Sequence, residues 1–99
     1  MDTITAFIDQ TSIGFGRLDE IGGLYEWLTE PTPGDFAPNA EDVDEDGDPL
    51  SSTIQRVGAS EVLIDMTKAD EAIYAAGYRT VGEWMHDGLD GLMVQVEAL

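Results

Sequence analysis

Three aspartates and a glycine near the middle of the chain have the spacing of a calcium-binding loop. Asp42, Asp44 and Asp46 alternate with other residues, and Gly47 follows directly. In a D-x-D-x-D-G loop the alternate carboxylates converge on one hard cation, and the glycine permits a sharp turn. The second half of the pattern is missing, because Thr53 stands where such a loop needs a bidentate glutamate. We therefore expect weak cation association at the three aspartates rather than a structural calcium site.

A second group of acidic side chains lies near the C-terminus. Glu83, Asp87 and Asp90 fall on one face if this region is a continuous helix. Neighbours along that row would be about 4.5 to 6 Å apart along the helix axis, comparable to the phosphate spacing of one DNA strand. The functional interpretation is a charge ladder that imitates a nucleic-acid backbone. The alternative is that any surface helix of a strongly acidic protein carries acids on its outer face.

Residues suited to catalysis are scarce. His86 is the only histidine, the chain has no cysteine, and no serine lies in a nucleophile-elbow motif. Glu83 and His86 have the helical spacing of carboxylate-bridged metal sites, but those sites need a second such motif and further carboxylates. We therefore expect a protein that is not an enzyme and that uses no cofactor.

Net charge is the feature that most restricts the partners. Twenty-one Asp and Glu stand against four Lys and Arg, which gives a formal net charge of −17 in 99 residues. Eleven of the acids lie between Arg17 and Arg56, where there is no basic residue. Such a charge repels nucleic acids and anionic membranes, and it attracts a basic protein surface or a cation. The residues predicted to bind a partner are Glu41, Asp42, Asp44, Glu45, Asp46 and Asp48, together with Glu83, Asp87 and Asp90.

The spacing of apolar residues predicts a mainly α fold, a small bundle of three or four helices in a single domain over residues 1–99. Apolar residues recur at helical spacing over residues 4–28. Glycines interrupt that stripe, so we expect two shorter helices with a bend near residues 14–16. Residues 51–76 also fit a helix, and Gly77 is well placed to end it.

The remaining segments are predicted to be a capped helix and a loop. Thr80 and Glu83 form a T-x-x-E capping box, which predicts a helix start. Residues 31–50 contain all four prolines and a run of acids, and we expect a long acidic loop there. The alternative is an α+β fold with short strands near residues 60–66 and 92–98.

Three functions agree with these observations. The first is an inhibitor made by a phage or mobile element that blocks a basic nucleic-acid-binding surface, such as that of a nucleic-acid-binding effector complex. In size, charge and lack of catalytic motifs the chain resembles DNA-mimic anti-restriction and anti-CRISPR proteins, a resemblance of composition without an alignable motif. The second is a small structural or interaction protein of an extreme halophile or its virus, in which acidity and a single lysine are adaptations to molar salt. The third is a weak calcium-binding module.

Location is predicted from what the sequence lacks. The N-terminal residues have no signal-peptide pattern, and the longest aliphatic run is Val62-Leu63-Ile64, so we expect no membrane span. The expected location is the cytoplasm, or the host cytoplasm for a viral protein. The sequence does not predict an oligomeric state.

The partner and salt-adaptation hypotheses differ in the salt that folding requires. We expect a cooperative thermal melt, followed by far-UV circular dichroism, in about 0.1 M KCl as well as in about 3 M KCl, where the Debye length is only a few ångströms. A chain that folds only in molar salt would instead carry its charge as an adaptation to the environment.

Overall fold

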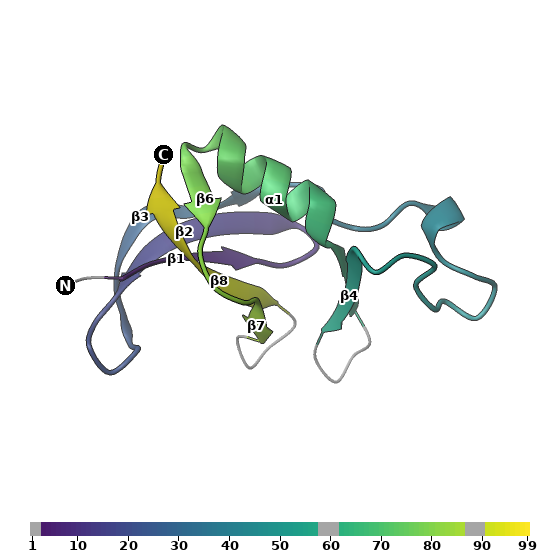
Figure 1. Cartoon of the computed structure of the whole chain (residues 1–99), viewed down its shortest axis with the longest axis horizontal. Coiled ribbons are helices and arrows are strands. Elements are labelled where there is room, and N and C mark those ends of the chain that lie inside the picture. The colour runs from purple at the N-terminus through teal and green to yellow at the C-terminus, as the bar shows by residue number, and fades with distance from the viewer. Residues whose placement is uncertain (1–2, 58–61, 87–90) are drawn as a thin grey trace.

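The computed structural model describes residues 3–57, 62–86 and 91–99 and shows a fold built mostly from antiparallel strands (Figure 1). In chain order the elements are β1 (Thr3–Ile8), β2 (Ser12–Leu18), β3 (Leu24–Pro33), the 3-10 helix η1 (Ala40–Asp42), β4 (Ile54–Val57), β5 (Val62–Asp65), α1 (Met66–Ala75), β6 (Tyr78–Thr80), β7 (Met85–His86) and β8 (Leu92–Ala98). The prediction of a mainly α bundle is therefore wrong.

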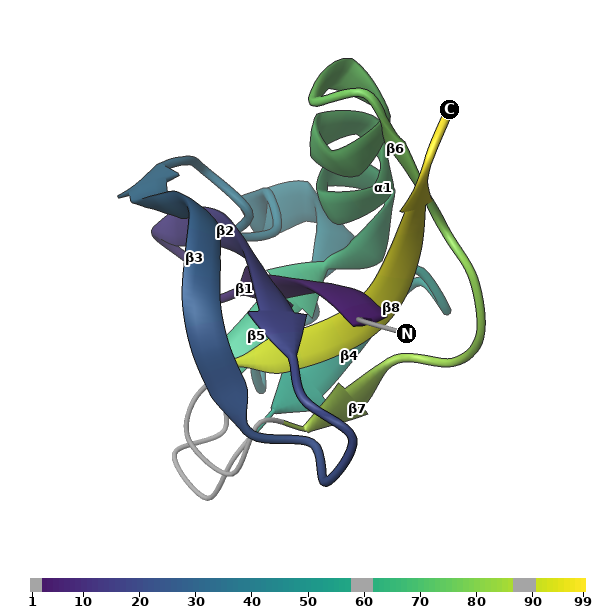
Figure 2. The ribbon, with the colours of Figure 1, turned by 90° about the vertical axis from the view of Figure 1, so that its left-hand side faces the viewer.

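One antiparallel sheet forms the body of the protein. Its strand order is β3-β2-β1-β8-β6, and β7 pairs with β8 as well. The strands curve beneath α1, which lies over one face of the sheet (Figure 2). A separate hairpin of β4 and β5 leads directly into α1. None of the helices in the described residues is long and apolar enough to cross a membrane.

The helices predicted over residues 4–28 are strands because two aspartate turns divide the segment. The Asp9 carboxylate accepts a hydrogen bond from the backbone N–H of Thr11 at 2.7 Å. The Asp19 carboxylate likewise accepts hydrogen bonds from the N–H groups of Ile21 and Gly23, at 3.0 and 2.8 Å. Aspartate side chains that bond nearby backbone N–H groups favour turns over continued helix.

The pKa of Asp9 reflects its turn. Partial burial raises the pKa, but hydrogen bonds from Thr11 and Ser12 lower it, and the net shift is downward. The folded state therefore binds a proton at Asp9 less readily than the unfolded chain does. This carboxylate stabilises the fold above its unfolded pKa, and the contribution is lost as the pH falls through the lowered value.

Two glycines that suggested a helix bend instead allow β3 to cross close over β2. A Cβ atom added at Gly14 would lie 3.0 Å from Cζ3 of Trp27 and 3.1 Å from the backbone nitrogen of Pro31. A Cβ atom added at Gly16 would clash with the end of the Leu24 side chain. The backbone and Trp27 of β3 confine Gly14, and at Gly16 the end of the Leu24 side chain would have to move. Neither glycine marks a helix bend.

The helix predicted from the capping box at Thr80 and Glu83 is also wrong. Gly82 has a left-handed backbone with φ of 95°, and β7 follows it. Farther on, Leu92, Val94 and Val96 are buried at every second position of β8, which is the period of a strand. The alternative strands near residues 60–66 and 92–98 are present as β5 and β8.

Only the second half of the segment 51–76 is helical. The carboxylate of Asp65 caps α1 by accepting a hydrogen bond from the N–H of Thr67 at 3.0 Å. After α1, Gly77 has a φ of 93°, so the prediction that this glycine ends the helix is confirmed. Ahead of α1, the β-branched residues of β4 and β5 form a hairpin in place of the predicted helix.

A single apolar cluster joins the sheet, the helix and the hairpin. Phe15 of β2 stacks on Tyr78 of β6 with ring centroids 4.8 Å apart. Phe36, which follows β3, is only 4% exposed, and its carbonyl accepts a hydrogen bond from the N–H of Asp65 at 2.8 Å. The buried members of the cluster are Ala6, Ile8, Phe15, Phe36, Val57, Ile64, Met66, Ala69, Ile73, Leu92, Val94 and Val96.

The close approach of β3 to β2 can be tested with a double-mutant cycle at Gly16 and Leu24. We expect Gly16→Ala to lower the free energy of unfolding by about 1 to 3 kcal/mol, because the added methyl group overpacks the contact. In a Leu24→Ala background the loss should be smaller, since the clashing side chain is gone. Urea unfolding of the four proteins measures the coupling, and an equal loss in both backgrounds would contradict the packing described here.

Candidate functional site

The acidic arm, which we define as residues 39–50, extends from the body at one end of the long axis (Figure 1). The protein measures 45 × 27 × 23 Å, and the arm contains η1 and an isolated antiparallel bridge between Val43 and Pro49. Glu41, Asp44, Glu45, Asp46 and Asp48 are all exposed in the arm. Of the acids predicted to bind a partner in this region, all but the half-buried Asp42 therefore face solvent on a projecting element.

Backbone hydrogen bonds turn the arm into a short hairpin. The N–H of Asp44 donates to the carbonyl of Asp48 at 2.9 Å, and the N–H of Gly47 donates to the carbonyl of Asp44 at 3.1 Å. Gly47 supplies the turn with a φ of 84°. On the other side of the bridge, the N–H of Leu50 donates to the carbonyl of Asp42 at 2.9 Å. Part of the predicted loop is thus a folded turn held by these backbone hydrogen bonds.

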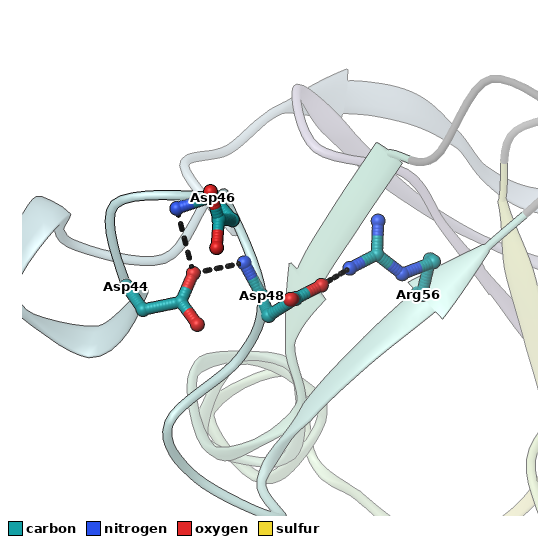
Figure 3. Close-up of polar contacts among 4 residues, drawn as sticks. All are labelled: Asp44, Asp46, Asp48 and Arg56. Atoms are coloured by element: carbon teal, nitrogen blue, oxygen red, sulfur yellow. Dashed lines mark hydrogen bonds and ion pairs between the residues drawn. The ribbon is translucent and has the colours of Figure 1, made fainter.

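The side chain of Asp44 organises the turn from within. Its Oδ1 atom accepts hydrogen bonds from the N–H groups of Asp46 at 2.9 Å and Asp48 at 2.8 Å (Figure 3). Asp48 in turn forms an ion pair with Arg56 of β4, with Oδ1 and Nη2 2.9 Å apart. The arm is therefore connected to the body by an ion pair as well as by its chain ends.

The structure brings together a different aspartate triad from the predicted one. Carboxylate oxygens of Asp44, Asp46 and Asp48 all lie within 4.8 Å of one another. Asp42, which the calcium pattern placed in the site, belongs to η1 and is not in this group. The calcium pattern did not include Asp48, although Asp44, Asp46 and Asp48 have the same alternate spacing as Asp42, Asp44 and Asp46. The turn at Gly47 decides between the two triads, because it folds Asp48 back toward Asp44.

The arm keeps most of its negative charge uncompensated. Two unit charges 4.8 Å apart repel by about 0.9 kcal/mol in bulk water, so a cation that approaches the triad is favoured. Outside the arm, Arg17 pairs with Glu26, Arg79 pairs with Glu97, and Nζ of Lys68 donates to the carbonyl of Ala37 at 2.8 Å. In the described residues the one ion pair of the arm is that of Asp48 with Arg56. Within residues 3–57, 62–86 and 91–99, the arm acids without an ion pair are Glu41, Asp42, Asp44, Glu45 and Asp46.

The charge ladder predicted near the C-terminus loses its geometric basis. Glu83 is exposed in the segment between β6 and β7, and His86 lies in β7 opposite Leu92. Asp87 and Asp90 lie outside the described residues. Because the described residues on both sides form strands, helical spacing no longer places the three acids in one row. That Glu83 contributes to partner binding stays a prediction.

Comparison with known protein families, curated proteins and solved structures finds no match for this chain. Its function therefore has to be argued from the geometry and charge of its own surface. The acidic arm is the part of the described surface where carboxylates converge, so the candidate site is placed there.

Calcium titration tests the triad. We expect no heat in the micromolar range and only millimolar association, because calcium needs six to eight oxygen ligands and Asp48 is already paired with Arg56. Asp46→Asn should weaken the association several-fold. Glu45→Gln removes the same charge from a residue outside the triad and should change it less. Saturation at micromolar calcium in isothermal titration calorimetry would instead indicate a complete binding site.

Proposed function

We propose that this chain is a non-enzymatic inhibitor that occupies a basic protein surface, of the kind that otherwise binds DNA or RNA, with its acidic arm. The observation that carries the proposal is a concentration of carboxylates on one projecting, internally hydrogen-bonded hairpin, where only Asp48 has an ion pair with another described residue. A DNA-mimic anti-restriction or anti-CRISPR protein is the most specific form of this proposal.

Local charge density favours the arm over the rest of the surface as the mimic. Dividing the accessible surface of 6137 Å² by 17 net charges gives about 360 Å² per charge. An idealised DNA cylinder with one charge per about 1.7 Å of axis has about 100 Å² per charge. Averaged over its surface, the protein is a poor copy of DNA. Clustering on the arm raises the local density, as a nucleic-acid mimic requires.

The internal structure of the arm also supports binding. Asp44 fixes the positions of Asp46 and Asp48 before any partner is present. An ordered binding element loses less conformational entropy on association than a disordered acidic tail does. The net charge then attracts a basic partner over a distance, which speeds association and makes it sensitive to salt.

Adaptation to molar salt is the second candidate, and it rests on composition. A single lysine in 99 residues and an excess of aspartate are typical of proteins that work at high salt. In that case the acids serve solubility, and the arm has no specific partner. The inhibitor proposal places the protein in the cytoplasm of a host cell, and the salt-adaptation proposal places it in the cytoplasm of a halophile.

Competition with DNA tests the proposed inhibitor. The protein should bind a CRISPR or restriction effector complex when the DNA channel is empty and lose that binding once DNA occupies the channel. Affinity, measured by biolayer interferometry, should fall steeply with salt. Across a panel of such effectors, binding that is unchanged by bound DNA would contradict the DNA-mimic proposal.

Charge-matched variants test the contribution of the arm. Replacing Glu41, Glu45 and Asp46 by Gln, Gln and Asn removes three charges without touching the Asp44 and Asp48 contacts that hold the turn. Replacing Glu20, Asp70 and Glu71 in the same way removes three exposed charges elsewhere. We expect the arm variant to lose at least about tenfold in affinity, because each charged contact contributes roughly 1 kcal/mol or more, and the control to lose much less. Equal losses would show that binding follows net charge alone.

A further inference from the structure

Two aromatic rings form a corner on the face of the sheet that lies away from α1. Ala6 and Ile8 of β1 are buried in the core with residues of α1, so Phe7 between them lies on the other face. The ring of Phe7 meets the indole of Trp27 with centroids 5.4 Å apart and an interplanar angle of 69°. Rings inclined so steeply present two faces to a group that occupies the angle between them.

Glycines in β2 allow the indole to reach this position. Gly14 lies opposite Phe7 in the pairing of β1 with β2. A Cβ atom added at Gly14 would be 3.0 Å from Cζ3 of Trp27, and one added at Gly16 would be 3.4 Å from Cε3. The six-membered ring of the indole therefore lies against the bare backbone of β2, which holds it before any ligand is present. Because Trp27 is still 38% exposed, part of the ring stays open to solvent.

The corner belongs to a hollow that has an acidic residue in its lining. The hollow has a volume of about 230 Å³, and Asp9 lines it together with Phe7 and Trp27. The N–H and the hydroxyl of Thr11 donate hydrogen bonds to Oδ1 of Asp9, at 2.7 and 3.0 Å, and hold this side chain in place. Among the described residues no Lys, Arg or His lines the hollow. A carboxylate beside aromatic rings attracts a cation through both Coulomb and cation–π interactions.

The rest of the lining selects the kind of cation. Besides Asp9, the described lining has Ser12 as its polar residue, and its other members are apolar, including Leu24 and Pro31. A lysine ammonium has three N–H donors and an arginine guanidinium has five, so either would turn most of its donors toward apolar side chains. A quaternary ammonium group has no N–H donor and contacts its surroundings through methyl groups. The hollow is also smaller than the pockets of drug-sized ligands, which suits a compact head group.

We propose that the hollow beside Trp27 binds a quaternary ammonium group, with the rings of Phe7 and Trp27 against its methyl groups and Asp9 as the counter-charge. Free quaternary amines and trimethylated lysine side chains present this same head group. The site lies on the body of the protein, outside residues 39–50, so it does not rest on the inhibitor proposal for the acidic arm.

Choline and an uncharged analogue, in which a tert-butyl group replaces the trimethylammonium group, test whether charge is recognised. The two molecules have nearly the same shape. In NMR titrations of the unmodified protein, with ionic strength held constant by NaCl, we expect choline to shift the indole N–H signal of Trp27 at millimolar concentrations. The analogue should bind at least about threefold more weakly, because it lacks the cation–π contact. Equal affinities, or a Trp27 signal that choline leaves unchanged, would overturn the proposal.

Two ring deletions locate the head group. Trp27→Leu keeps an apolar side chain and removes the indole, whereas Tyr74→Leu removes an exposed ring that is not in the lining. Choline affinity, followed by the backbone amide signals of residues 7–9, should fall at least about threefold for Trp27→Leu and stay unchanged for Tyr74→Leu. Amide spectra recorded without choline show whether each variant keeps the fold. Unchanged affinity in a folded Trp27→Leu protein would contradict the proposed site.

Two aspartate substitutions separate the counter-charge from the net charge of the protein. Asp9→Asn removes one charge and keeps an oxygen that can accept the hydrogen bonds of the turn, and Asp19→Asn does the same at the other aspartate turn. Asp19 does not line the hollow. Choline affinity should fall at least about threefold for Asp9→Asn and change less for Asp19→Asn, because the Coulomb attraction falls with distance. Equal losses would mean that choline follows net charge alone, and the site would be rejected.

The source of the head group is tested with a short glycine peptide that carries one trimethyllysine. The same peptide with unmodified lysine should bind at least about threefold more weakly, because the ammonium is strongly hydrated and its N–H donors face apolar side chains. A trimethyllysine peptide that binds more tightly than choline would identify a protein side chain as the ligand, and weaker binding would identify a free quaternary amine. A preference for unmodified lysine would overturn the proposal.

Discussion

The pairing of β1 with β8 is the interaction on which the other contacts depend, because it joins the first and last strands of the chain at the centre of the sheet. Ile4 lies opposite Val96, and Ala6 lies opposite Val94. Ala6, Val94 and Val96 are buried, and the partly buried Ile4 packs against them. α1 packs onto that surface through Ala69 and Ile73. Without this pairing α1 would have no continuous sheet face to pack against. The core thus depends on contacts between residues about as far apart in sequence as the chain allows.

This arrangement separates apolar burial from charge. The central strands and α1 supply the buried side chains, while the carboxylates of residues 41–48 lie on an element outside the core. Phe36 marks the boundary, because its ring is buried while the arm that follows is exposed. Strongly repelling groups therefore do not have to be accommodated among the packed side chains. A chain with so few cations can form a core because its acids are kept at the periphery.

Some of the fold could be predicted from the sequence, and the errors have a physical cause. The glycine that ends α1 and the acidic loop follow from local chemistry and were predicted, except that residues 31–33 of the predicted loop belong to β3. The first strands were mistaken for helices because Phe7 faces Trp27 on one side of the sheet while Ala6 and Ile8 face the core, which hides the alternation of a strand. At the site, spacing identified Asp44 and Asp46. Whether Asp42 or Asp48 joins them depends on how the turn folds, because both lie at the same alternate spacing in the sequence.

The acidic arm contacts the body through an apolar contact and an ion pair, which respond differently to salt. Phe36 fixes its base by apolar burial, which ordinary salt weakens little. The ion pair of Asp48 with Arg56 holds the C-terminal part of the arm, and both side chains are partly exposed, so dissolved ions screen it. A rise in ionic strength therefore weakens the ion pair more than it weakens the apolar contact. Dissolved salt thus acts on a contact between the arm and the body as well as on the attraction of the arm for a partner.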